Sequence, residues 1–145
     1  MMNDSVFDYH INKVIPNTIL ANKEFFLQNI IREPKNMDYF ITKDTYKKAC
    51  NKMGLEVSNI SCNFTANVIN GFFVVFGEFL ENNNIKAIAF ATKNNTIRYF
   101  TYDEKNMVGE WKIINDKVTE FISYQKTNSF KVSLFAGVIA SILKG

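Results

Sequence analysis

Histidine is almost absent from this chain, and its scarcity excludes most histidine-dependent chemistry. His10 is the only histidine, so a catalytic triad or acid–base pair has one candidate, in the least periodic part of the chain. The two cysteines, Cys50 and Cys62, have no CxxC spacing, and with a single histidine they cannot assemble a zinc set. We therefore expect an ordinary surface histidine, two buried thiols, no metal and no cofactor.

Glycine and net charge are also low. The chain has six glycines and none of the motifs GxGxxG, GxxxxGK[ST], GxSxG or HExxH, which leaves little material for a phosphate cradle or a nucleophile elbow. A net charge of +3, with basic residues spread among 14 acidic ones, gives too weak a positive field for a nucleic-acid backbone. We expect a protein that is not an enzyme and does not bind nucleic acid.

Targeting and membrane-spanning signals are missing as well. Met1 to His10 carries Asn3, Asp4 and Asp8 in place of a basic n-region and an apolar h-region. No apolar run approaches the roughly 20 residues that span a bilayer. The sequence predicts a chain that is cytoplasmic when synthesised and not transmembrane, while export without a signal peptide stays open.

Three strand-like segments are the most informative feature that is present. They cover Phe72–Leu80, Ile85–Thr92 and Thr96–Tyr102, separated by short Asn-rich connections. Asn tolerates positive φ in hairpin turns, so the pattern predicts an antiparallel meander. Because none of the segments has a clean polar face, both faces of this sheet should be covered.

The register of the last hairpin predicts which side chains share a face. If Asn94 and Asn95 form a two-residue turn, residue 92 opposes 97 and residue 90 opposes 99. One face is then packed core, formed by Ile88, Phe90, Ile97 and Tyr99. The other face combines small and large side chains, which predicts a shallow groove; a docked helix could also fill it. This face is formed by Ala87, Ala89, Ala91, Arg98, Phe100 and Tyr102.

The N-terminal third predicts helices after an irregular start. Residues 1–21 show no sustained period, and Pro16 marks a turn, so part of this segment is expected to be an extended or mobile arm. A helix is predicted over Lys23–Arg32, and a second runs from Thr42 or Asp44 to Met53, before Gly54. A first strand follows over Val57–Ile69.

The C-terminal part is less clearly patterned. Glu110–Ile114 fits either a fifth strand or the start of a helix, and the spacing of Trp111, Val118 and Phe121 favours a helix through about Tyr124. Phe130–Leu143 predicts an apolar terminal helix, along which the small residues Ser133, Gly137 and Ser141 recur every four positions. The prediction is one α+β domain over 1–145: an antiparallel four- to five-stranded meander with N-terminal helices and a C-terminal apolar helix packed on the curved sheet.

The strand rhythm resembles a known superfamily. Leu55–Phe64, Gly71–Phe79 and Ile85–Phe90 look like strands of half a tubular lipid-binding (TULIP-like) domain, in which a curved sheet wraps a long helix. The chain also resembles the smallest open-reading-frame-X proteins of clostridial neurotoxin gene clusters. The resemblance covers roughly Gly54 to Gly145 and implies a non-catalytic accessory protein that works with larger proteins of the same cluster.

We expect a module that binds a partner protein through an apolar sheet face or its C-terminal helix, as part of a neurotoxin-associated complex. The alternative is a binder of a small apolar ligand or lipid, and a minor third is an enzyme with Tyr99, Arg98 and Glu78 in one cavity. The candidate partner- or ligand-binding residues are Phe72, Val74, Ala87, Ala89, Ala91, Phe100, Tyr102, Ser133, Gly137 and Ser141.

Overall fold

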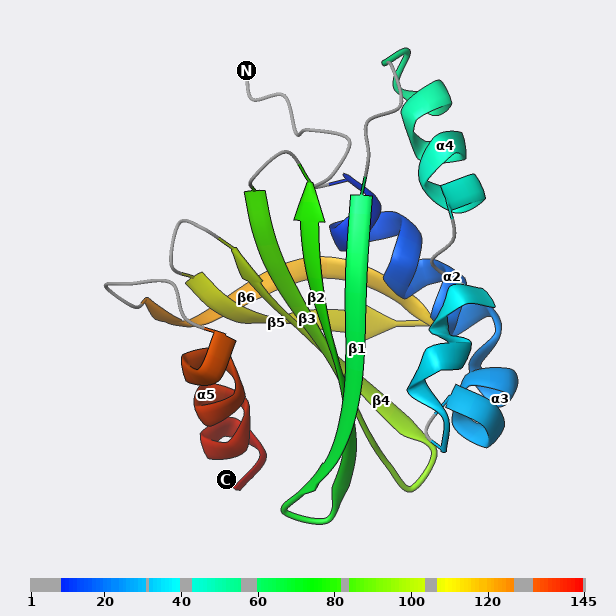
Figure 1. Cartoon of the computed structure of the whole chain (residues 1–145). Coiled ribbons are helices and arrows are strands. Elements are labelled where there is room, and N and C mark those ends of the chain that lie inside the picture. The colour runs from blue at the N-terminus through cyan, green and yellow to red at the C-terminus, as the bar shows by residue number, and fades with distance from the viewer. Residues whose placement is uncertain are drawn as a thin grey trace.

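An antiparallel sheet organises the molecule. The computed structural model describes residues 9–30, 32–39, 43–55, 60–81, 84–103, 107–126 and 132–144. These residues form six strands that pair in chain order (Figure 1). The strands are β1 (Ile60–Ile69), β2 (Phe72–Glu81), β3 (Asn84–Lys93), β4 (Thr96–Asp103), β5 (Met107–Ile114) and β6 (Lys117–Lys126). The predicted α+β class and antiparallel meander are confirmed, with one strand more than expected.

Two-residue turns with positive φ set the register of three hairpins. Asn94 and Asn95 have φ of 53° and 64°, and Asn115 and Asp116 have 52° and 58°. Asn70 and Gly71 complete the series, since a left-handed pair matches the twist of the flanking strands. Thr92 consequently opposes Ile97, and Phe90 opposes Tyr99, as the sequence predicted.

The helix predicted through Tyr124 is wrong, because this segment is the hairpin of β5 and β6. The Asn115–Asp116 turn reverses the chain in the middle of the apparent helical spacing. Trp111 and Phe121 are cross-strand partners whose ring centroids lie 5.0 Å apart. Their spacing, which looked helical, arises from strand pairing.

The N-terminal third is helical from its first described residues. It contains η1 (His10–Val14, a π-helix), α2 (Ile15–Ala21), α3 (Lys23–Phe25), η2 (Phe26–Ile30, also π), η3 (Pro34–Tyr39, a 3-10 helix) and α4 (Lys43–Lys52). The expected helices over Lys23–Arg32 and up to Met53 therefore exist, the first as α3 followed by η2. Gly54, with φ of +69°, ends the second as predicted.

The extended or mobile arm expected within residues 1–21 is wrong for residues 10–21, while residues 1–8 lie outside the described residues. Ile11, Ile15 and Ile19 recur every four positions and are all buried against the sheet. Pro16 does not interrupt them, because it lies in the first turn of α2, where a backbone N–H is dispensable.

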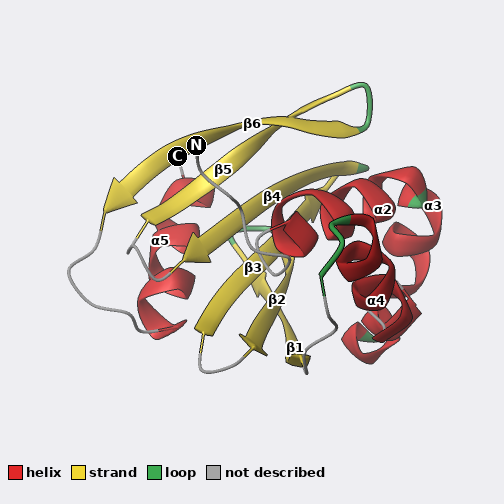
Figure 2. Ribbon diagram, turned by 90° about the horizontal axis from the view of Figure 1, so that it is seen from above, coloured by secondary structure: helices red, strands yellow, loops and turns green. Residues whose placement is uncertain are grey.

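The sheet separates two hydrophobic cores (Figure 2). On one face, η1, α2, η2 and η3 pack on Val75, Phe79, Ile88, Phe90 and Tyr99; we call this the helical face. On the opposite face lies α5 (Val132–Lys144), and we call that side the α5 face. A smaller cluster of Tyr46, Ala49 and Cys50 joins α4 to the N-terminal helices. Both faces of the central strands are thus covered, as their apolar sequences require.

His10 is buried, which corrects the expectation of a surface histidine. Its ring packs edge-on to Tyr46 with centroids 5.3 Å apart. Neither ring nitrogen has a hydrogen-bond partner among the described residues. Burial lowers the pKa of His10 from 6.5 to about 4, because the charged imidazolium would lose its hydration there.

We predict that His10 makes the protein acid-sensitive. Above pH 6.5 the imidazole is neutral in both states, but between 6.5 and about 4 only the unfolded chain takes up the proton. The free energy of unfolding should therefore fall as pH decreases through this window, by on the order of 3 kcal/mol in total.

Urea titrations of wild type and His10→Leu between pH 4 and 7.5 measure this effect. The difference in free energy of unfolding between the two proteins should depend on pH only between about 4 and 6.5, since the other titrating groups are common to both proteins. Parallel pH profiles for the two proteins would contradict the assignment.

Candidate functional site

The groove predicted on the sheet is filled by α5. Phe135, Ile139 and Leu143 lie over it, and the Phe135 ring contacts Tyr102 and Phe76 at centroid distances of 5.7 and 6.2 Å. The candidate residues covered in this way are Val74, Ala87, Ala89, Ala91, Phe100 and Tyr102, all buried, with Phe72 partly buried. The alternative of a docked helix is therefore confirmed, and the predicted groove is not open at Ala87, Ala89, Ala91, Phe100 and Tyr102.

Two of the small residues of α5 lie on its outer side. Gly137 and Ser141 are exposed, and a Cβ added at Gly137 would meet nothing within 4 Å. The side chain of Ser133 lies outside the described residues. Asn70 tethers the helix by donating its Nδ2–H to the carbonyl oxygen of Ala140 at 3.0 Å. At Gly137 no neighbour approaches closely, contrary to the expected use of this position in tight packing.

The two edges of the sheet differ in chemistry. β6 carries Lys117, Glu120 and Lys126, and the Val118 N–H donates to Asn17 Oδ1 of α2 at 3.0 Å. β1 is ten residues long and contains no charged residue, proline or glycine. Charges and proline are the usual protection of an edge strand against pairing with another chain. In the described part of the chain only β2 pairs with β1, so the outer side of β1 is a candidate interface.

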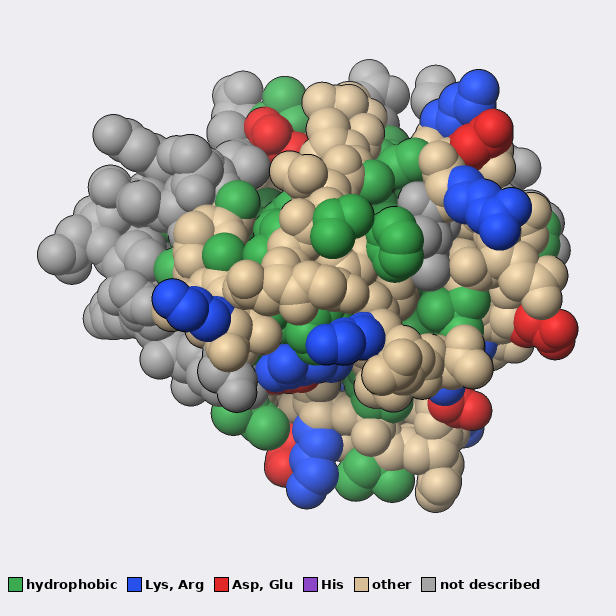
Figure 3. All heavy atoms as spheres, turned by 90° about the horizontal axis from the view of Figure 1, so that it is seen from below, with side chains coloured by type: hydrophobic (Ala, Val, Ile, Leu, Met, Phe, Trp, Pro, Cys, Tyr) green, Lys and Arg blue, Asp and Glu red, His purple; other side chains and the backbone are tan. Residues whose placement is uncertain are grey.

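Apolar side chains adjoin this unprotected edge. Val68 of β1 and Phe73 of β2 are direct cross-strand partners on the helical face, and they are 61% and 50% exposed. The 3-10 helix η3 contacts β1, but it leaves these two side chains exposed. From the end of the molecule with the β1–β2 and β3–β4 turns, apolar side chains lie between charges of both signs (Figure 3).

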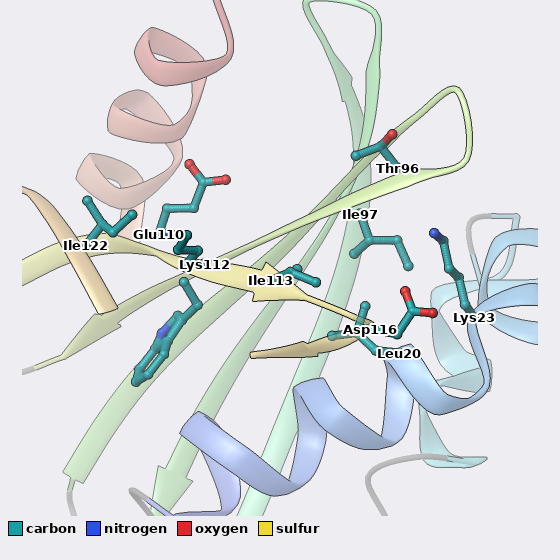
Figure 4. A pocket seen from close by; sticks show the side chains of 10 residues that line it. Leu20, Lys23, Thr96, Ile97, Glu110, Lys112, Ile113, Asp116 and Ile122 are labelled. Atoms are coloured by element: carbon teal, nitrogen blue, oxygen red, sulfur yellow. The ribbon is translucent and has the colours of Figure 1, made fainter. Parts of the chain in front are cut away.

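An opening between β4 and β5 is a second candidate site, which sequence reasoning missed. These strands pair from Tyr99↔Trp111 to Asp103↔Met107 and diverge beyond Trp111. A cavity of about 390 Å³ occupies the divergence (Figure 4). Its apolar lining includes Leu20, Ile97, Trp111, Ile113 and Ile122, and its polar lining Lys23, Thr96, Glu110, Lys112 and Asp116. The sequence did not predict this site because it did not predict the β5–β6 hairpin. With a helix in that segment, there would be no β5 to diverge from β4.

Ion pairs fix part of the rim. Arg98 donates from Nε and Nη2 to the two carboxylate oxygens of Glu110, both at 2.8 Å, and the Arg98 guanidinium lies 5.4 Å from the Phe100 ring centroid. Glu110 is only 14% exposed, so this bidentate pair is partly shielded from water. Lys112 and Glu120 form a looser, exposed pair at 3.6 Å. The first pair ties β4 to β5 at the inner end of the opening.

Tyr99, Arg98 and Glu78 do not assemble into one cavity. The Tyr99 hydroxyl is on the helical face and donates to the carbonyl oxygen of Ile11 at 2.6 Å. Burial raises the pKa of this phenol well above its usual range. Arg98 lies on the α5 face, and Glu78 is exposed. These three side chains therefore supply no common acid–base site.

Comparison of the chain with protein-family models, curated proteins and solved structures found no match. Among the described residues, no three His, Cys, Asp or Glu side chains gather where they could hold a metal ion. None of the described helices has the length and apolar character needed to cross a membrane.

We predict opposite effects for two neighbouring α5 substitutions. Phe135→Ala should lower the free energy of unfolding by about 3–5 kcal/mol, because it leaves a cavity in the hydrophobic core between α5 and the sheet, which also contains the Tyr102 ring. Gly137→Ala should raise it by roughly 0.5–1 kcal/mol, because alanine restricts the unfolded backbone and meets no neighbour here.

Chemical denaturation of both variants checks this placement of α5. A loss of stability in Gly137→Ala matching that in Phe135→Ala would mean that the small row is packed, contrary to the arrangement described.

Proposed function

We propose that this chain is a non-catalytic protein-binding module whose β1 edge pairs with an extended strand of a partner polypeptide. The observation that carries the proposal is the uncharged, proline-free outer edge of a ten-residue strand. Strand addition satisfies the main-chain N–H and C=O groups of such an edge with those of the incoming chain. The contrast with charged β6 at the opposite edge supports β1 as the pairing side.

The apolar side chains beside the edge supply a second contribution. An added strand would place alternate side chains on the helical face, next to Val68 of β1, with Phe73 one strand further in on β2. Burying an exposed Val or Phe side chain fully contributes roughly 1.5–3 kcal/mol, and these two are half or more exposed. Main-chain pairing gives affinity, and the pattern of side chains opposite this pair gives selectivity.

The proposal moves the interface predicted from the sequence away from the centre of the sheet. The strip of Ala87, Ala89 and Ala91, which motivated lipid binding, is filled by α5, so no observation favours a lipid there. The outer flank of α5 is exposed at Gly137 and Ser141 and remains a second contact for a large partner. The resemblance to small open-reading-frame-X proteins makes larger products of neighbouring genes the first partners to test.

We predict that lysines on the β1 edge block partner binding without unfolding the protein. Thr65 and Asn67 are both exposed on the α5 face of β1, so Thr65→Lys/Asn67→Lys adds two charges and leaves the core intact. Desolvating these ammonium groups beside an incoming strand should weaken binding by about tenfold or more. Biolayer interferometry with purified products of the neighbouring genes measures the change.

The matched control is Asn51→Lys/Thr119→Lys, which adds the same charge at exposed positions of α4 and β6. It should bind as wild type does, and circular dichroism should show all three proteins folded. Equal loss of binding in the control, or undiminished binding by the β1 variant, would refute edge pairing.

A further inference from the structure

The opening between β4 and β5 has features of a small-molecule site that are independent of the β1 edge. At Thr96–Arg98, β4 pairs with β3 on one side, and at Lys112–Ile114, β5 pairs with β6 on one side. These two segments do not pair with each other, because the β4–β5 ladder ends at Tyr99 and Trp111. The facing edges therefore present main-chain donors and acceptors to whatever enters between them.

The floor of the opening is apolar. Ile97 and Leu20 are almost completely buried, and Ile113 and Trp111 are partly buried beside them. The indole of Trp111 is fixed by donating its Nε1–H to Thr101 Oγ1 at 3.1 Å and by the Phe121 ring. A rigid aromatic and aliphatic floor binds apolar groups with little loss of side-chain entropy.

Two charges at the rim have no ion pair or hydrogen bond with the residues that the structure describes. Glu110 is held by Arg98, and Lys112 by Glu120. No ion pair or hydrogen bond among the described residues involves the side chain of Lys23 or Asp116. Figure 4 shows both projecting into the same end of the opening, Lys23 from α3 and Asp116 from the β5–β6 turn. One cation and one anion therefore lie together beside an apolar floor.

We propose that this opening binds a small zwitterion with an apolar side chain, which is the chemistry of a free α-amino acid such as phenylalanine or leucine. Lys23 receives the carboxylate and Asp116 the ammonium group, while the side chain lies on Ile97, Ile113 and Trp111. The cavity, about 390 Å³, lies near the lower end of the roughly 300–1,000 Å³ range of ligand pockets and suits a ligand of this size.

The single tryptophan makes the proposal directly testable. Trp111 lines the opening, so excitation at a wavelength that selects indole reports binding without a label. L-Phenylalanine should change this emission saturably, with a Kd of about 1 mM. Phenethylamine, which lacks the carboxylate, and 3-phenylpropionate, which lacks the ammonium group, should each bind about tenfold more weakly, and glycine should not bind detectably.

Charge-removing variants assign each end of the ligand. Lys23→Gln should abolish the preference for phenylalanine over phenethylamine, and Asp116→Asn the preference over 3-phenylpropionate. Asn also tolerates the positive φ of 58° at position 116, so the turn is kept. Lys47→Gln and Glu78→Gln remove the same charges at exposed positions that do not line the opening, and both variants should keep the two preferences.

Isothermal titration calorimetry on the folded 145-residue proteins provides the second readout. The proposal is overturned if wild type shows neither a saturable emission change nor heat with phenylalanine up to about 20 mM. It is equally overturned if the two preferences persist in Lys23→Gln and Asp116→Asn, or disappear in the two control variants.

Discussion

The structure depends on a strand that is buried on both sides. Five consecutive residues of β3, from Ala87 to Ala91, are buried, and alternate side chains point to opposite faces of the sheet. Ile88 and Phe90 require the N-terminal helices, whereas the three alanines require α5. Neither cover is optional, because removing one would expose a contiguous apolar surface. The alanines matter because their small size lets Phe135 lie close to the sheet.

The sequence contains this constraint in readable form, which is why the central hairpins were predictable. The two-residue turn at Asn94 and Asn95 determines the register of β3 and β4. Because successive side chains of a strand point to opposite faces, the register also determines which residues share a face. The α4 helix and its end at Gly54 were predictable for the same reason, since the helical period and the stop signal agree. At these positions local preference and tertiary packing favour the same conformation.

The errors fall where a local pattern has two interpretations. Trp111, Val118 and Phe121 satisfy a helical spacing, but a turn of Asn115 and Asp116 between them converts the spacing into cross-strand pairing. At the N-terminus, Pro16 looked like a break and concealed the four-residue recurrence of the isoleucines. The prediction of the candidate site failed for similar reasons. Its predicted groove was a contact within the molecule, and the β4–β5 opening could not be foreseen without the β5–β6 hairpin.

The difference between the two sheet edges limits how an assembly through strand addition could grow. Head-to-tail growth needs complementary surfaces at both ends of the repeating unit, so that each added subunit offers a new site. Here β1 lacks charges, while β6 carries Lys117, Glu120 and Lys126. Addition at β1 therefore uses up the only charge-free edge of the described sheet. If a partner strand adds at β1 as proposed, this asymmetry of the edges favours a complex that stops growing over a fibre.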